Sequence, residues 1–137
     1  MKHRPIHARY SALLVLLAWG SWAHAGDIVV VMSPSAGALT KDQVANVYLG
    51  RNTALQPVDL PESSDVRQDF YKKATGRDAA QVKAVWTRLT FTGGGQPPKE
   101  VPDDAAVKKA VASDVKAIGY IKKASVDSSV KVVLELD

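Results

Sequence analysis

The 137-residue chain contains no cysteine, and its three histidines all lie within the first 25 residues. Without cysteine, the protein forms no disulfide bond and has no thiol nucleophile. Beyond residue 25 there is also no imidazole, so histidine-containing zinc sites and Ser-His or Cys-His catalytic pairs are excluded there. The remaining carboxylates, lysines and tyrosines do not form a recognised catalytic spacing. We therefore expect a protein with no enzymatic activity, no cofactor and no metal site.

The first 25 residues have the pattern of a secretory signal peptide. Three basic residues precede an apolar run at positions 12–19, and Ala-His-Ala at positions 23–25 supplies a cleavage site. A retained membrane anchor is the alternative, but the apolar run is shorter than the ~20 residues that span a bilayer. We expect cleavage after residue 25 and release of residues 26–137 into the periplasm of a Gram-negative envelope, as one domain.

Neither sign of charge is in large excess. The whole chain has 18 basic and 14 acidic residues, a net charge of +4. Three of the basic residues belong to the expected signal peptide, so residues 26–137 carry 15 basic against 14 acidic residues, a net charge of +1. A nucleic-acid-binding surface requires a marked excess of lysine and arginine. We therefore expect no nucleic-acid partner.

The exported part begins with an alternation of strand and helix patterns. The continuous apolar run at 27–32 is typical of a strand that is covered on both faces. Thr40 and Gln43 then form a capping box, and the helix that they start is expected to end at Gly50. A later helix carries Trp86 among apolar residues at helical spacing, which predicts a buried anchor on one face with Val82, Val85 and Leu89.

The rest of the chain continues this alternation. In chain order, the expected elements are a strand at 56–60, helices at 64–75 and from 78, a loop at 92–98, a helix from 102–103, and strands at 117–121 and 130–134. Strands that alternate with helices predict an α/β layer architecture.

The junction between the second strand and the helix after it carries the strongest functional signal, with Ser63, Ser64 and Arg67. A helix start offers free N–H groups and the positive end of the dipole, so these side chains predict an oxyanion site. Ser33 and Ser35, after the first strand, are further ligand candidates. The plain alternative is that the serines cap a helix or a loop.

Acidic residues surround the one cation of this junction. Asp59, Glu62 and Asp65 lie within eight residues of Arg67 and compete with an anion for its guanidinium. If Arg67 serves the ligand, its removal is expected to weaken binding while folding changes little.

Two other motifs have plain interpretations. The glycines at 93–95 lack the Lys-Ser/Thr ending of a P-loop, which favours a turn over a phosphate cradle. Asp103-Asp104 is more simply a helix start than a metal site.

Several short motifs follow one another in a distinctive order. They are Leu39-Thr40, Val47-Tyr48-Leu49-Gly50, Pro57-Val58, Ser63-Ser64 with Phe70, Trp86 with Phe91-Thr92-Gly93, and Ala117-Ile118-Gly119-Tyr120. In this order they resemble the phosphate-binding subunit of phosphate ABC transporters. The resemblance covers nearly all of residues 26–137, but it corresponds to one of the two lobes that the family closes around its anion.

The resemblance implies an α/β fold, namely one lobe of a type 2 periplasmic binding protein with a central mixed, mostly parallel sheet flanked by helices. It also implies a solute-binding-like protein that binds a small oxyanion, phosphate above all, in ABC-type phosphate uptake. The family's strand arginine and Gly-Ser-Gly-Thr helix start are absent, since Asp59-Leu60 and residues 63–66 (Ser-Ser-Asp-Val) stand in their places. The alternative is a lobe without a ligand that serves as an envelope interaction module and docks a membrane transporter or another envelope protein.

Overall fold

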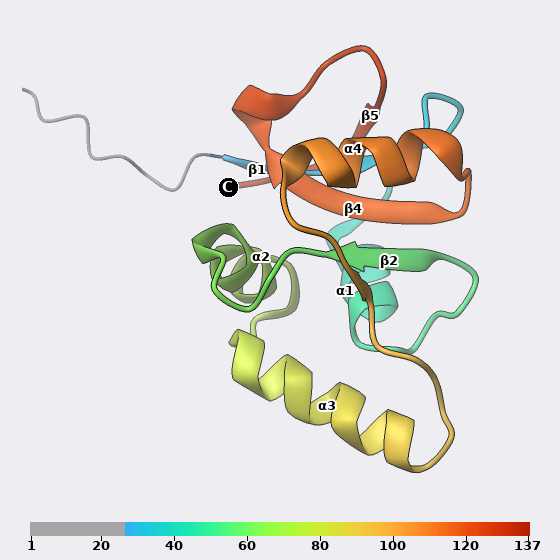
Figure 1. Cartoon of the computed structure of the whole chain (residues 1–137), viewed down its shortest axis with the longest axis vertical. Helices are drawn as coiled ribbons and strands as arrows, with labels where there is room; N and C mark the ends of the chain where they lie inside the picture. Colours follow the sequence, from blue (N-terminus) through green and yellow to red (C-terminus); the bar gives the residue numbers. More distant parts are fainter. Residues whose placement is uncertain (1–26) are drawn as a thin grey trace, which may run out of the picture.

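The computed structural model describes residues 27–137, so the predicted signal peptide lies outside the described residues. The described part is a sheet flanked by helices (Figure 1). Its elements are β1 (Ile28–Met32), α1 (Lys41–Tyr48), β2 (Gln56–Asp59), α2 (Asp65–Thr75), α3 (Ala79–Phe91), β3 (Lys99–Glu100), α4 (Asp104–Ser113), β4 (Ala117–Lys122), the 3-10 turn η1 (Lys123–Ser125) and β5 (Lys131–Leu136).

The sheet has the strand order β3-β2-β4-β1-β5. Strand β2 pairs in parallel with both β3 and β4, whereas β1 is antiparallel to β4 and β5. All strands except β1 therefore point the same way, and the predicted mixed, mostly parallel sheet is confirmed. Strand β1 lies between β4 and β5, and all five of its residues are buried, as its continuous apolar run indicated.

Helices cover both faces of the sheet, with α4 on one face and α1 and α2 on the other (Figure 1). Neighbouring residues of β4 show this, because successive side chains of a strand point to opposite faces. Tyr120 stacks on Phe70 of α2 with ring centroids 3.9 Å apart. On the other face, a Cβ atom at Gly119 would lie 2.5 Å from Val107 of α4. Only glycine lets α4 pack so closely on β4.

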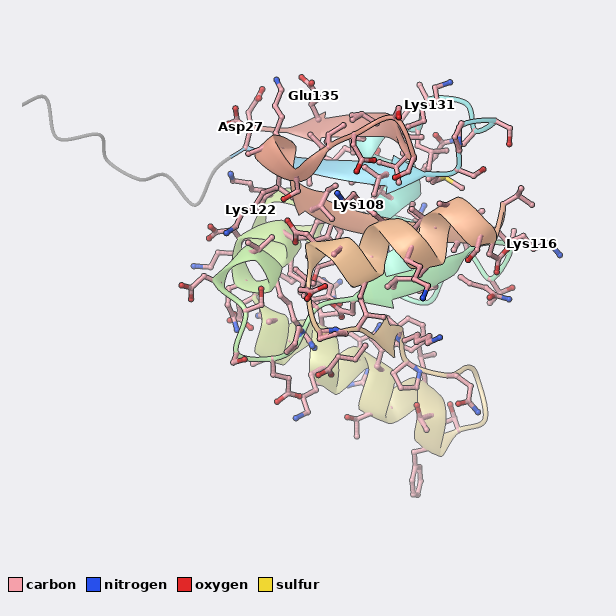
Figure 2. All side chains as sticks on the ribbon, turned by 45° about the horizontal axis from the view of Figure 1, so that its top comes forward. Asp27, Lys108, Lys116, Lys122, Lys131 and Glu135 are labelled. Atoms are coloured by element: carbon pink, nitrogen blue, oxygen red, sulfur yellow. The ribbon has the colours of Figure 1, made fainter. Side chains whose placement is uncertain are left out.

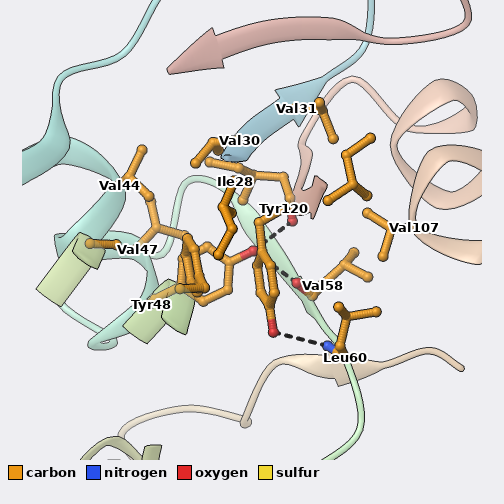
Figure 3. Close-up of a cluster of buried hydrophobic side chains, with 14 of the residues drawn as sticks. Ile28, Val30, Val31, Val44, Val47, Tyr48, Val58, Leu60, Val107 and Tyr120 are labelled. Atoms are coloured by element: carbon orange, nitrogen blue, oxygen red, sulfur yellow. Dashed lines mark hydrogen bonds between the residues drawn. The ribbon is translucent and has the colours of Figure 1, made fainter. Parts of the chain in front are cut away.

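Tyr48 connects α1 to the sheet from inside the core. Its hydroxyl donates hydrogen bonds to the carbonyl oxygens of Val58, at 2.8 Å, and Ile118, at 3.2 Å. Burial, together with the nearby charge of Asp59, raises the pKa of Tyr48 well above its ordinary value, so the hydroxyl keeps its proton. Figure 3 shows Tyr48 and Tyr120 within one cluster of buried side chains that reaches from Val44 to Val107.

The helix starts follow the sequence signals. Gln43 N donates to Thr40 Oγ1 at 3.2 Å while Thr40 N donates to Gln43 Oε1 at 2.8 Å, so the predicted capping box of α1 is confirmed. Asp103 accepts a hydrogen bond from Ala106 N at 2.9 Å and caps α4, which confirms the helix-start interpretation of Asp103-Asp104.

Two features of the α3 region differ from the sequence predictions. Strand β3 was not expected, because the three residues between Pro98 and Pro102 carry no strand pattern. It extends the sheet by pairing with β2, and the next amide, Val101 N, donates to Asp59 O at 2.8 Å. On α3, Val85 and Leu89 are only half-buried, since this helix packs beside α2 at the edge of the fold. Trp86 is the predicted anchor, 9% exposed, with its indole Nε1 donating to Tyr48 O at 2.8 Å.

Charged side chains of both signs are spread over the surface around β4, β5 and α4, as Figure 2 shows. Its labelled residues are Asp27, Lys108, Lys116, Lys122, Lys131 and Glu135. Lys131 and Glu135 belong to β5, Lys108 to α4 and Lys122 to β4, whereas Asp27 and Lys116 directly precede β1 and β4.

Candidate functional site

The junction of β2 and α2 is built around the helix cap. Ser64 adopts an extended backbone conformation, and its Oγ accepts a hydrogen bond from Arg67 N at 3.3 Å. This is the N-cap geometry, worth ~1 kcal/mol to a helix. The cap interpretation of Ser64 is therefore confirmed, and its hydroxyl already satisfies one free amide of the helix start. Ser63, one residue earlier, is exposed.

Ser63 and Ser64 line a groove between the start of α2 and the start of α4, which we call the Ser63–Ser64 groove. Asp103 and Asp104 line the same groove, with Lys122 beside them. Asp104 accepts hydrogen bonds from the Lys122 amide at 3.2 Å and from Ser125 Oγ at 2.7 Å. The charged residues that line this groove are thus two carboxylates and one ammonium group.

Arg67 does not line this groove. Its side chain is buried, with the residue 9% exposed, and Nη1 donates to Leu60 O at 2.9 Å. Two carboxylates stand just outside hydrogen-bond distance, Asp59 at 3.7 Å from Nε and Glu100 at 3.8 Å from Nη1. The expectation that removing Arg67 changes folding little does not fit this burial. A buried ion pair that loses one partner leaves the other charge uncompensated, which destabilises the folded state.

Asp59, at the end of β2, is the counter-ion that the fold supplies. Its carboxylate is buried and accepts hydrogen bonds from the hydroxyls of Tyr71 and Tyr120 and, at 3.0 Å, from Leu60 N. Burial, reinforced by the charge of Asp59, raises the pKa of both tyrosines above the ordinary value. The two tyrosines therefore act as permanent hydrogen-bond donors to this carboxylate.

The hydrogen-bonding capacity of the pair is not exhausted. A carboxylate has about four lone-pair sites, and the protein fills three of those on Asp59, which leaves one on Oδ2. Within residues 27–137, Nε of Arg67 is buried without a hydrogen-bond partner, and Nη2 donates no hydrogen bond to the protein either. The Nε and Nη2 donors lie on one edge of a guanidinium, and Nε is 3.7 Å from Asp59 Oδ2. Arg67 thus keeps a planar pair of donors beside a single remaining acceptor.

These two residues line a cavity of about 510 Å³ on the α3 side, which we call the Arg67 cavity. Its other walls are formed by one face of α3, including Trp86 and Phe91, and by the prolines 97 and 98 before β3. At its rim Lys83 Nζ pairs with Glu62 Oε1 at 2.8 Å, and this contact, first through its hydrogen bond, lowers the pKa of Glu62. The cavity therefore combines a polar end with largely apolar walls.

The five residues predicted as ligand contacts do not meet in one place. Ser63 and Ser64 line their own groove, whereas Arg67 lines the Arg67 cavity. Ser33 follows β1, which runs antiparallel to β4, so Ser33 and Ser35 lie at the opposite end of the sheet from the β2–α2 junction. Their hydroxyls are 3.2 Å from each other, at a turn in which Ala36 N donates to Ser33 O at 3.0 Å. Ligand contact by any of the five stays a prediction.

The tyrosines of the site were not predicted from the sequence, in which Asp59 was expected only to repel an anion. One signal was available, because Arg67 and Tyr71 stand four residues apart and must share a helix face. In the structure the guanidinium carbon of Arg67 lies 5.7 Å from the centroid of the Tyr71 ring. Tyr120 is 61 residues from Asp59 along the chain, and no local pattern connects the two.

Two further properties concern residues 27–137 alone. No helix in this range is long and apolar enough to cross a membrane. The same residues contain no group of three or more aspartate or glutamate side chains arranged to hold a metal ion.

Comparison with known proteins gives matches at the level of structure only. No protein-family model and no curated protein matches the chain. Among solved structures, it is similar to an ABC-type phosphate transport receptor from Vibrio cholerae, with 21% identity and a TM-score of 0.61, over 78% of this chain and 45% of the receptor. It is also similar to a putative phosphate ABC transporter substrate-binding protein with bound phosphate from Clostridium perfringens, with 22% identity and a TM-score of 0.63, over 78% of this chain and 44% of that protein.

The chain thus spans less than half the length of each of these two proteins. At 21% and 22% identity, the likeness concerns the fold. It confirms the resemblance inferred from the motifs: this chain has the fold of a single lobe-sized part of the phosphate ABC transporter substrate-binding proteins.

Proposed function

We propose that the chain is a non-catalytic, solute-binding-like protein of the periplasm that binds a small oxyanion, most simply phosphate, at Arg67. The observation that carries this proposal is the buried guanidinium of Arg67, which lines the Arg67 cavity and whose Nε has no hydrogen-bond partner within residues 27–137. The Nε/Nη2 edge of a guanidinium has two parallel N–H donors, which match two oxygens of a phosphate or carboxylate group. The fold shared with two phosphate transport proteins supports the same interpretation.

Asp59 adds a condition on the ligand. Asp59 Oδ2 lies 3.7 Å from Arg67 Nε and keeps one lone pair that the protein does not use. This oxygen can accept a hydrogen bond, so it favours a ligand that carries a proton. Near neutral pH phosphate keeps a P–OH proton, whereas sulfate has none and presents only negative oxygens. An anion with a proton satisfies both residues, and an anion without one is repelled by Asp59. We therefore expect phosphate to bind better than sulfate.

Of the four predicted serines, only Ser64 has a role in this proposal. Ser64 positions Arg67 by capping the helix turn that carries it, since the Arg67 amide donates to Ser64 Oγ. Ser63, Ser33 and Ser35 line or adjoin other surfaces and are not required. The two fold neighbours are described as transport proteins, so the proposed role is in anion uptake, with a membrane transporter as the partner.

Calorimetric titration of the purified protein with phosphate and with sulfate, at low salt and neutral pH, tests the proposal. We expect saturable binding of phosphate, with sulfate about tenfold weaker or more, because one unmatched charged hydrogen bond costs about 1.5–3 kcal/mol. Arg67→Lys keeps the charge but removes the planar donor edge, so phosphate affinity should fall by a similar factor.

Arg51→Lys is the matched control, because Arg51 is exposed after α1 and lies outside the Arg67 cavity. Circular dichroism of each variant checks that the fold is intact. The proposal fails if neither anion gives saturable heat, or if Arg67→Lys binds phosphate as well as the unchanged protein does.

The second candidate is an envelope interaction module without a small ligand. It is favoured by the Ser63–Ser64 groove, where Asp103 and Asp104 oppose an anion at the helix start. Phe91 at the end of α3 supports it as well, because its side chain is 92% exposed. Absence of binding by both anions would leave this function as the better interpretation.

A further inference from the structure

The Arg67 cavity is much larger than a bare tetrahedral anion. Its volume of about 510 Å³ lies within the range of roughly 300–1,000 Å³ that is usual for sites of small organic molecules. A phosphate ion held at Arg67 would leave most of this space to water. The cavity therefore has room for a ligand with more atoms than the anionic group alone.

The charged residue of α3 that lines the cavity, Lys83, lies in the first half of the helix. Arg67 lies near the first turns of this helix, since it also lines a small adjoining pocket with Ala79 and Lys83. The cavity wall continues to Phe91 in the last turn. Lys83 and Phe91 are eight residues apart, which corresponds to roughly 12 Å along a helix.

The far end is apolar on both sides. Trp86 and Phe91 line it from α3, and Pro97 and Pro98 line it from the segment that enters β3. These four side chains offer apolar surface without charge, and the hydroxyls of Thr87 and Thr90 lie beside them on the helix. A ligand that fills both ends needs an anionic head for Arg67 and an apolar body for this wall.

We propose that the Arg67 cavity binds an organic oxyanion, in which a protonated phosphonate- or phosphate-like head meets Arg67 and Asp59 and an apolar body lies between α3 and the prolines before β3. The inference rests on the proposed function, because it uses the same head-group site. It differs in the class of ligand, since the body contributes binding energy that inorganic phosphate cannot supply.

Methylphosphonate and phenylphosphonate are suitable probes, because their head groups are alike and only the body differs. Both should be titrated calorimetrically at mildly acidic pH, where each head keeps one proton. We expect phenylphosphonate to bind about tenfold tighter or more, because the phenyl ring buries more apolar surface than the methyl group.

Thr90→Trp tests where the body lies, because Thr90 is exposed and lines the apolar end of the cavity. The indole should fill that end and abolish the preference for phenylphosphonate while leaving methylphosphonate affinity unchanged. Ala84→Trp is the matched control, since Ala84 is an exposed α3 residue outside this cavity. Circular dichroism should show unchanged helix content for both variants.

The outcomes separate the two proposals. Equal affinity for the two phosphonates overturns the inference and leaves an anion site at Arg67 intact. A phenylphosphonate preference that survives Thr90→Trp overturns it as well, because the ring then binds elsewhere. If neither phosphonate nor phosphate binds, the inference and the proposed function both fail.

Discussion

From the structure, we expect Arg67→Ala to destabilise the fold, whereas the sequence alone predicted little change in folding. A first-turn arginine serving only a ligand would contribute little to folding, but here the residue is 9% exposed and lies within 4 Å of carboxylates of β2 and β3. The substitution removes the hydrogen bond that Nη1 donates to Leu60 O at 2.9 Å. It also removes the cation nearest to the buried Asp59 carboxylate, at 3.7 Å. Both changes should destabilise the folded state.

The size of the loss follows from these contacts. Removing one partner of a buried ion pair typically costs about 3–5 kcal/mol. The cost should be lower here, because Asp59 keeps three hydrogen bonds from Tyr71, Tyr120 and Leu60 N after Arg67 is gone. A Leu60 carbonyl left without its partner adds about 1–3 kcal/mol. We expect a total loss of about 2–4 kcal/mol in the free energy of unfolding, which is large for a domain of this kind.

Urea denaturation at neutral pH measures this loss. The fluorescence of Trp86, the only tryptophan in residues 26–137, reports on unfolding, and circular dichroism provides a second probe. Arg51→Ala is the control, because Arg51 is exposed and surface changes usually stay within about 0.5 kcal/mol. An Arg67→Ala loss as small as that of the control would refute the reasoning and mean that the guanidinium is solvated.

A double-mutant cycle with Asp59→Asn isolates the ion pair. If Arg67 and Asp59 stabilise each other, the double variant should lose less stability than the two single variants together. Strictly additive losses would show that Arg67 acts through Leu60 and packing alone.

Four further predictions concern other parts of the chain. Trp86→Ala should cost about 3–5 kcal/mol in denaturation experiments, because it removes a large buried ring and its hydrogen bond to Tyr48 O; a loss under ~0.5 kcal/mol would contradict this packing. Ser64→Ala should cost ~1 kcal/mol by removing the α2 cap, whereas Ser64→Thr should restore most of it. The hydrogen bond from Lys108 lowers the pKa of Asp127. The stability that this contact provides is therefore complete above the unfolded pKa of about 3.9 and is lost as pH falls through the lowered folded pKa. Asp127→Asn should reduce the free energy of unfolding less at pH ~2 than near neutrality, and equal losses at both pH values would contradict this. The exported protein should begin at Gly26, which the intact mass of the periplasmic form can check.

The division between the two candidate surfaces has a simple geometric origin. Ser64 and Arg67 are three residues apart, close to one helical turn, but Ser64 belongs to the extended chain before the helix, whereas Arg67 is inside the first turn. Their hydrogen bond joins the Arg67 backbone to the Ser64 side chain, so it leaves the guanidinium free to extend the other way. Ser64 and Arg67, although three positions apart in the sequence, therefore line two different surfaces.

The sequence alone determined most of the secondary structure. Capping residues such as Thr40 and Asp103 act within one turn, and the inward positions Val66, Phe70 and Ala74 of α2 follow from the helical period. The β1 run is apolar at every position, which is enough to predict burial on both faces. These signals are local, and each can be found within a few neighbouring residues.

The tertiary structure decided the site. Whether Arg67 faces solvent or the interior depends on Asp59 and on Tyr120, whose strand β4 reaches β2 only when the sheet forms. Strand β3 likewise exists only because β2 offers it a partner. A buried charge is stable only where other segments bring hydrogen bonds and an opposite charge to it, and those segments are far apart in the chain. The sequence therefore determined which residues could form the helices. Only the packing of distant strands decided that Arg67 and Asp59 lie beside each other and line one cavity.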